Sequence, residues 1–261
     1  MELKEINSLV ELFFKKYEEK TSNDFEKSKE LFLTSLKNKN QPDTLSGPYT
    51  YSWRNIGSKI KVLTNYLKKI ISKGDRCILL SENRPEWLIS DIAIMNAGGV
   101  TVPLFTTYSK NDYEYIIKDC EPKVCIVSDI EQFKKIKNYI TEKTILISID
   151  QFDEKIDFFE HIFLKARTSL EILKDSVISY NDKLRRNDLA CIIYTSGTTG
   201  NPKGVMLSHG GILSNCEGAE EILKSLTKKD PPVFLTWLPL SHSYEHTVQY
   251  VQILLGSKIF Y

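Results

Sequence analysis

The residues best suited to chemistry lie in one short stretch, YTSGTTGNPKG, which runs from Tyr194 to Gly204. Its glycines allow backbone N–H groups to turn toward an anion, and its hydroxyl groups can donate hydrogen bonds to phosphate oxygens. Its lysine adds a positive charge. The candidate phosphate-binding residues are Thr195, Ser196, Gly197, Thr198, Thr199, Gly200 and Lys203. We therefore interpret this stretch as a loop that holds the phosphates of a nucleotide.

The loop shares only part of the P-loop pattern. Gly197 and Lys203 have the spacing of the first glycine and the lysine in a P-loop. A P-loop also has glycine before the lysine and a hydroxyl residue after it, and it runs directly into a helix. Here Pro202 and Gly204 stand beside the lysine. The loop is therefore expected to neutralise phosphate without a helix directly after it.

The segments on either side of the loop predict a strand before it and a second strand after it. LACIIY (189–194) and GVMLS (204–208) are short apolar runs of the kind found in strands, and Ser208 is a candidate helix cap. The alternative is a hairpin turn without a function. A loop of about nine residues is longer than most hairpin turns, which favours a binding role.

A second candidate site, LPLSHSYEH, lies at residues 238–246. His242, Glu245 and His246 match H-x-x-E-H, the inverted zinc-peptidase motif, and two imidazoles four residues apart on a helix can hold one Zn²⁺. However, the pattern is short, Pro239 places His242 near the entry of the helix, and a catalytic zinc needs a third protein ligand. These observations count against a zinc site, so we predict no metal ligands. A zinc peptidase and a simple pair of polar residues at a helix start are the alternatives.

The elements that must position these residues alternate between strand and helix patterns from about residue 50. Apolar residues recur at helical spacing between 56 and 70, and Gly74 is expected to end that helix. Pro85 and Ser109 are expected at helix starts. Strands are expected at 76–81, 100–105, 123–128 and 143–148, with helices between them, including one near 131–140. The pattern predicts an α/β fold with a largely parallel sheet covered by helices. Residues 150–188 are irregular and are interpreted as a variable connection.

The composition is that of a globular protein without a polyanionic partner. Of 261 residues, 41% are hydrophobic and the formal net charge is +1, so no nucleic acid is expected to bind. No apolar run approaches the length of a membrane span, and the N-terminus lacks the apolar core of a signal peptide. The five cysteines lack C-x-x-C spacing and are expected to be reduced and mostly buried. The expected location is the cytoplasm, and no protein partner is predicted.

Two stretches together resemble a known family. YTSGTTGNPKGVMLSH closely resembles the phosphate-loop signature of the AMP-forming acyl-adenylating enzymes, which include acyl-CoA synthetases, luciferases and peptide-synthetase adenylation domains. WLPLSHSYEH resembles the next motif of that family. LLSENRPEW (79–87), GGVTVPLF (98–105) and the LPL-x-H-x-x-E form are similar to the long-chain fatty acyl-CoA synthetase branch. The resemblance covers residues 50–261 and extends only loosely to 1–49.

The resemblance implies an ATP-dependent long-chain fatty acid–CoA ligase that uses Mg²⁺. The loop would wrap the β- and γ-phosphates of ATP while the fatty acid carboxylate attacks the α-phosphorus, and CoA would then accept the acyl group. His242, Tyr244 and His246 would lie on the acyl and adenylate side. Fatty acid, ATP and CoA would be the substrates. Peripheral contact with the inner face of the membrane, for a lipid substrate, is left open.

The resemblance also implies a division of the chain. Residues 1–49 would form an N-terminal helical segment, and 50–261 the first part of the AMP-binding domain. The catalytic residues, the rest of that domain and a small C-terminal domain would lie beyond Tyr261. We therefore expect an N-terminal portion of a longer synthetase that is inactive alone. A catalytically dead nucleotide-binding remnant is the alternative.

Overall fold

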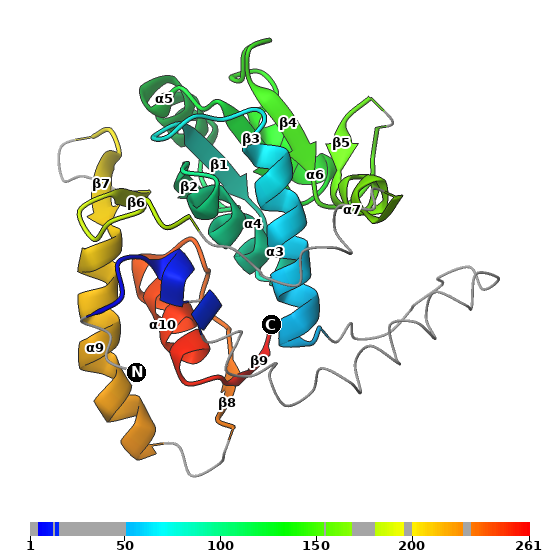
Figure 1. Ribbon diagram of the computed structural model, residues 1–261. Coiled ribbons are helices and arrows are strands. Elements are labelled where there is room, and N and C mark those ends of the chain that lie inside the picture. Colours follow the sequence, from blue (N-terminus) through cyan, green and yellow to red (C-terminus); the bar gives the residue numbers. More distant parts are fainter. Residues whose placement is uncertain are drawn as a thin grey trace.

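The structure is a computed structural model that describes residues 5–12, 14–15, 51–153, 155–168, 181–195, 200–226 and 231–261; of the side chains in these ranges, those of 166–168, 224 and 226 are not described. Within these residues the centre is a seven-stranded sheet with the order β5-β4-β3-β1-β2-β6-β7 (Figure 1). Its strands are β1 (Arg76–Leu80), β2 (Val100–Leu104), β3 (Val124–Val127), β4 (Ile145–Ser148), β5 (Asp157–Phe158), β6 (Leu189–Thr195) and β7 (Lys203–Ser208). All neighbours are parallel except β6 and β7, which are antiparallel. A parallel pair, β8 (Val233–Leu235) and β9 (Lys258–Phe260), forms a second sheet.

Helices connect and cover these strands. They are α3 (Trp53–Leu67), α4 (Pro85–Asn96), α5 (Lys110–Cys120), α6 (Ile130–Ile136), α7 (Phe159–Thr168), α9 (His209–Leu226) and α10 (Ser243–Leu254). The expected start signals are confirmed: Pro85 is the first residue of α4, and Ser109 caps α5 by accepting a hydrogen bond from the Asp112 N–H. Ser208 Oγ likewise accepts from the Gly211 N–H at the start of α9. The predicted α/β fold with a mostly parallel sheet is confirmed.

Two expectations about local structure are wrong. Gly74 does not end the first predicted helix, because α3 stops at Leu67 and Gly74 lies in a later turn, where its N–H donates to the Gly98 carbonyl. The interval 150–188 is not wholly irregular, since it contains β5 and α7. Residues 169–180 lie outside the described residues.

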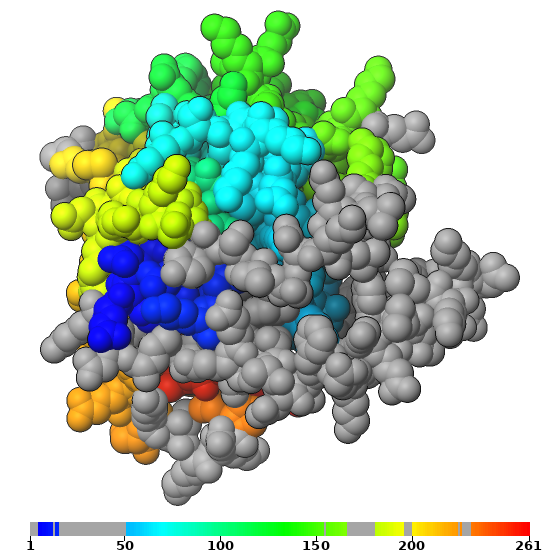
Figure 2. Space-filling view, in the orientation of Figure 1, coloured from blue at the N-terminus to red at the C-terminus, as the bar shows by residue number. Residues whose placement is uncertain are grey.

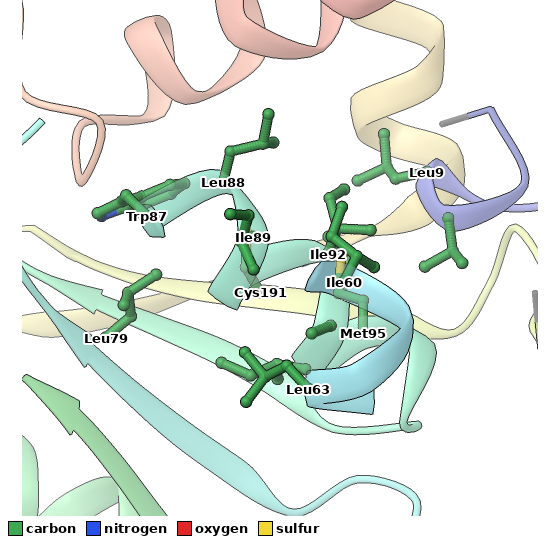
Figure 3. Close-up of a cluster of buried hydrophobic side chains, with 14 of the residues drawn as sticks. Leu9, Ile60, Leu63, Leu79, Trp87, Leu88, Ile89, Ile92, Met95 and Cys191 are labelled. Carbon is green, nitrogen blue, oxygen red and sulfur yellow. The ribbon is translucent and has the colours of Figure 1, made fainter. Parts of the chain in front are cut away.

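Alternate residues of the central strands face two separate hydrophobic cores. Cys77 and Leu79 of β1 belong to the larger core, with side chains from α3, α4, α7, α9 and α10, whereas Ile78 and Leu80 belong to a smaller core with α5 and α6. Helices therefore cover both faces of the sheet, as a parallel sheet requires. Figure 3 shows part of the larger core, where labelled side chains of α3, α4, β1 and β6 gather together.

The N-terminal segment is part of this larger core. Ile6, Leu9 and Phe14 are fully or almost fully buried, and Figure 3 shows Leu9 close to the side chains of α3 and α4. The Ile6 carbonyl accepts a hydrogen bond from Arg186, and Figure 2 shows the blue N-terminal residues lying against the yellow-green surface of residues 181–195. Residues 16–50 lie outside the described residues, so the predicted helical segment 1–49 is described only in part.

The five cysteines are all described, and each is buried and free, which confirms that expectation. Burial raises the pKa of the Cys77, Cys125 and Cys191 thiols, so the neutral thiol is the stable form. Among the described residues, no helix is both long enough and apolar enough to span a bilayer.

Candidate functional site: a hairpin and a helix entry at one edge of the sheet

The predicted phosphate loop connects β6 to β7. The two strands pair as an antiparallel hairpin in which Thr195 lies opposite Lys203, so these two candidate residues face each other where the loop begins and ends. The loop itself spans 196–202, one residue shorter at each end than the sequence indicated. Ser196, Gly197, Thr198 and Thr199 lie outside the described residues. Gly200 has a φ of +115°, a conformation that glycine adopts easily and other residues do not.

Tyr194 fixes the base of this hairpin. Its ring lies against Gly204 on the opposite strand, where an added Cβ would be 3.2 Å from the ring and 2.9 Å from Ile192. Its carbonyl accepts a 2.8 Å hydrogen bond from the Tyr108 hydroxyl, and its own hydroxyl donates to Asp119 of α5. Burial and the Asp119 carboxylate raise the pKa of Tyr194, so it stays a neutral donor. The loop therefore leaves the sheet from a tightly held base.

Lys203 keeps its ammonium group accessible. The residue is exposed, and no hydrogen bond or ion pair joins its side chain to any other residue that the structure describes. Thr195 is exposed as well. An exposed cation and an exposed hydroxyl at the mouth of a glycine-containing loop are the groups that a polyphosphate needs.

The second candidate stretch lies near the same edge of the sheet. β6 and β2 are parallel neighbours, so the loop after β6 and Phe105 after β2 both follow the carboxyl ends of their strands. The Phe105 ring lies 6.2 Å from the His242 ring, measured between centroids. His242 therefore approaches the edge from which the loop emerges. Ligands of open parallel sheets bind at this carboxyl edge.

The two histidines of the H-x-x-E-H match have different surroundings. His242 is exposed and is the N-cap of α10, where its Nδ1 accepts from the Tyr244 N–H at 3.2 Å. His246 is 2% exposed and its Nε2 lies 3.0 Å from Asp91 Oδ2. Tyr244 is exposed. The expected place of His242 at the helix entry is confirmed. Among the described residues no cluster of three or more metal-ligating side chains occurs, and the zinc interpretation gains no support from the geometry.

A buried polar network holds α10 against α4. Asp91 is fully buried in α4 and accepts a hydrogen bond from the Tyr250 hydroxyl, in addition to the contact with His246. Tyr250 and His246 also contact each other at 2.6 Å, and Trp87 meets the His246 ring edge-on. Burial and the Asp91 charge raise the pKa of Tyr250. The network fixes the helix whose first turn follows His242.

A second buried histidine lies where β7 meets α9. His209 is fully buried, and its Nδ1 accepts a 3.2 Å hydrogen bond from the Leu9 N–H of the N-terminal segment. Because Nδ1 accepts, the proton of the neutral ring lies on Nε2, which has no partner within the part of the chain that the structure describes. Burial lowers the pKa of His209 to about 4. The strand that follows the loop is thus followed directly by a buried, neutral histidine, the first residue of α9.

Sequence reasoning did not identify Asp91, Tyr108 or Tyr194 as parts of this arrangement. Asp91 carried a signal, because a lone aspartate within the apolar run WLISDIAIM is rarely buried without a partner. The two tyrosines carried none, since their roles depend on contacts between strands and helices distant in sequence.

Comparisons with known proteins place the chain in a family. A family model described as AMP-binding enzyme matches residues 34–261. Fatty acyl-CoA synthetase A of Dictyostelium discoideum is 33% identical over 214 residues, which are 78% of this chain and 30% of that protein. Long chain acyl-CoA synthetase 3 of Arabidopsis thaliana is 29% identical over 236 residues, 83% of this chain and 34% of that protein. The chain thus spans about a third of the length of these curated relatives.

Solved structures share the fold. The luciferase-like enzyme from the nonluminescent mealworm Zophobas morio matches with a TM-score of 0.72 and 19% identity, covering 97% of this chain and 54% of that one. ATP-bound MatB from Rhodopseudomonas palustris matches with a TM-score of 0.65 and 24% identity, covering 85% of this chain and 43% of that one. The resemblance seen in the sequence is confirmed: the chain belongs to the AMP-binding enzyme family, and its curated relatives include a fatty acyl-CoA synthetase and long-chain acyl-CoA synthetases.

Proposed function

We propose that the protein carrying this chain is an ATP-dependent long-chain fatty acid–CoA ligase, and that residues 50–261 supply the phosphate-binding side of its site. The observation that carries the proposal is the β6–β7 hairpin, in which Thr195 and Lys203 meet at the mouth of a glycine-containing loop at the carboxyl edge of the sheet. Membership of the AMP-binding family supports a nucleotide as the phosphate ligand. The names of curated relatives, which include a long chain acyl-CoA synthetase and a long-chain fatty acid–CoA ligase, support a long-chain fatty acid as the acid.

The chemistry requires two steps. An oxygen of the fatty acid carboxylate attacks the α-phosphorus of ATP, and the bond from that phosphorus to the bridging oxygen breaks, which yields acyl-AMP and pyrophosphate. The sulfur of CoA, which gives up its proton, then attacks the acyl carbon and releases AMP. The first step is needed because a free carboxylate has no good leaving group.

The loop residues would act on the departing pyrophosphate. Negative charge accumulates there as the bond breaks, and preorganised donors stabilise such charge most effectively. Lys203 would supply the positive charge, and the hydroxyl and backbone N–H donors would come from Thr195, Ser196, Gly197, Thr198, Thr199 and Gly200. ATP would bind as its magnesium complex, since Mg²⁺ is commonly held through substrate phosphates. The exposed side chains of Thr195 and Lys203 suit phosphate oxygens and not the metal ion itself, so the ion would be held through the nucleotide.

The helix entry would act on the acyl and adenylate side. The Nδ1 atom of His242 accepts from the Tyr244 N–H, which leaves Nε2–H as a donor for an oxygen of the carboxylate or the adenylate. Tyr244 is exposed beside it and would offer an apolar ring to the acyl group. We propose that His246 serves this side indirectly, because its contacts with Asp91 and Tyr250 hold α10 in place.

The test is acid-dependent exchange of labelled pyrophosphate into ATP by the whole purified protein that carries this chain, which reports the first step alone. Palmitate, acetate and coumarate are compared at equal concentration, and CoA thioester formation is followed in parallel. We expect exchange with palmitate well above that with the other two acids. Equal or greater exchange with acetate or coumarate would contradict the long-chain assignment. Absence of exchange with every acid would contradict adenylate formation by this protein.

A further inference from the structure

A single side chain, that of Asn83, binds the turn that precedes α10. Asn83 follows β1 by three residues. Its Nδ2 group donates to the Leu238 carbonyl at 2.7 Å, and its Oδ1 atom accepts from the Leu240 N–H at 2.9 Å. One planar amide therefore holds a donor and an acceptor of the same backbone segment, on either side of Pro239.

This pair of hydrogen bonds fixes where the segment lies and which way it runs. A carboxamide that donates to a backbone carbonyl and accepts from a backbone N–H fixes the register of the segment, as a neighbouring β-strand does. Shifting the segment by one residue would break both hydrogen bonds. Leu240 is 1% exposed, so its N–H is removed from competing water. The turn can then shift relative to the end of β1 only if these bonds break.

The position of His242 depends on this turn, because the two are joined by a backbone hydrogen bond. Its N–H donates to the Pro239 carbonyl at 2.9 Å, and Pro239 lies between the two residues that Asn83 binds. Behind the helix entry, Asp91 contacts His246 and Tyr250. The segment that follows β1 therefore holds the His242 region at two places, through Asn83 at the turn before α10 and through Asp91 along α10 itself.

We propose that Asn83 is a positioning residue for the acid-activating step: it sets the place of His242 relative to the carboxyl edge of the sheet. This inference rests on the proposed function, in which His242 serves the acyl and adenylate side. Asn83 itself touches neither substrate in this scheme. Its effect should therefore fall on the acid and not on the phosphates of ATP, which the β6–β7 loop would bind.

Two substitutions separate the two hydrogen bonds. Asn83→Asp keeps an acceptor for the Leu240 N–H but removes the donor to Leu238 and sets a carboxylate against a carbonyl. Asn83→Ala removes both bonds. Asn138, which is exposed after α6, gives a matched control, since Asn138→Asp makes the same change of charge away from the turn.

The first readout is amide hydrogen exchange, which needs no activity. The Leu240 amide should keep its protection in Asn83→Asp and in Asn138→Asp, and lose it in Asn83→Ala. The second readout is pyrophosphate exchange. Because a displacement of about 1 Å can cost on the order of a hundredfold in rate, we expect kcat/KM for palmitate to fall about tenfold or more in both Asn83 variants, while KM for ATP stays within about twofold.

The outcomes distinguish positioning from a general loss of stability. A purely structural role would lower the folded fraction, and thus kcat, with KM unchanged for both substrates, which would overturn the proposal. Unchanged Leu240 protection in Asn83→Ala would also overturn it. If the unaltered protein shows no pyrophosphate exchange with any acid, the proposed function is wrong, and so is the role of Asn83 in catalysis that depends on it. Amide hydrogen exchange then still shows whether Asn83 holds the turn.

Discussion

The buried histidine at the start of α9 makes folding sensitive to acid. His209 has an ordinary pKa of 6.5 and a pKa of about 4 in the folded protein, because burial penalises its charged form. Lys73 opposes protonation as well, whereas Asp188 and Asp91 favour it. The folded state thus binds fewer protons than the unfolded chain between these two values. The stability that the neutral ring provides is complete above pH 6.5 and is lost as pH falls toward about 4.

The size of the effect follows from the shift. One pKa unit corresponds to about 1.4 kcal/mol, so the full shift from 6.5 to about 4 corresponds to about 3.5 kcal/mol. The loss is not yet complete at pH 4.5, which lies above the pKa of the folded state. Between about pH 7.5 and about pH 4.5 the protein should therefore lose about 2.5 kcal/mol of stability. The loss has a structural counterpart, because a protonated ring no longer accepts the Leu9 N–H at Nδ1.

The assay is urea unfolding at both pH values for the unaltered protein and two variants. His209→Asn keeps an acceptor for the Leu9 N–H but does not titrate, so it should lose about 2.5 kcal/mol less on acidification. His209→Leu should share that lower acid sensitivity, yet be less stable than His209→Asn at both pH values by about 1–3 kcal/mol, because the Leu9 N–H is left unpaired. If the unaltered protein and His209→Asn lose the same stability on acidification, the assigned burial of a neutral histidine is wrong.

Two further changes test the packing around the site. Gly204→Ala places a Cβ 2.9 Å from Ile192 and 3.2 Å from the Tyr194 ring, so it should destabilise the protein by about 1–3 kcal/mol, and Ile192→Ala in the same chain should recover part of this loss. Gly218→Ala is the matched control, since its added Cβ meets nothing within 4 Å; equal melting temperatures for the two alanine variants would contradict the predicted clash. Tyr250→Phe removes a donor to the buried Asp91 carboxylate and should cost about 2 kcal/mol in urea unfolding, and an unchanged midpoint would show that this bond contributes nothing.

Local signals in the sequence predicted most of the elements but not their arrangement. Pro85 and Ser109 act within their own first helical turns, so the helix starts could be identified from a few residues. The order of the strands depends on which neighbours pair, and no local pattern specifies that β2 lies beside β6. The prediction that Gly74 ends the first helix was wrong because α3 ends at Leu67, seven residues earlier, without a glycine at its end.

The candidate site divides in the same way. The donors of the β6–β7 loop are consecutive in sequence, so their density could be recognised without the fold. The contacts of Asn83 with Leu238 and Leu240 span 155 and 157 residues, and that of His209 with Leu9 spans 200. Such contacts arise only when the sheet and helices assemble, and a single sequence contains no local pattern that reveals them. α7 was missed although its Phe159, Ile162 and Phe163 have helical spacing.

Binding of the ATP phosphates by the β6–β7 loop is tested most directly by the affinity of the purified protein for ATP, measured by equilibrium titration. Lys203→Ala is compared with Lys123→Ala, which removes an exposed lysine from the opposite, amino-terminal edge of the sheet just before β3. Because a charge-assisted hydrogen bond contributes about 1.5–3 kcal/mol, Lys203→Ala should weaken ATP binding by about tenfold or more. Lys123→Ala should bind as the unaltered protein does. Equal ATP affinity in the two variants would contradict the assignment of the loop.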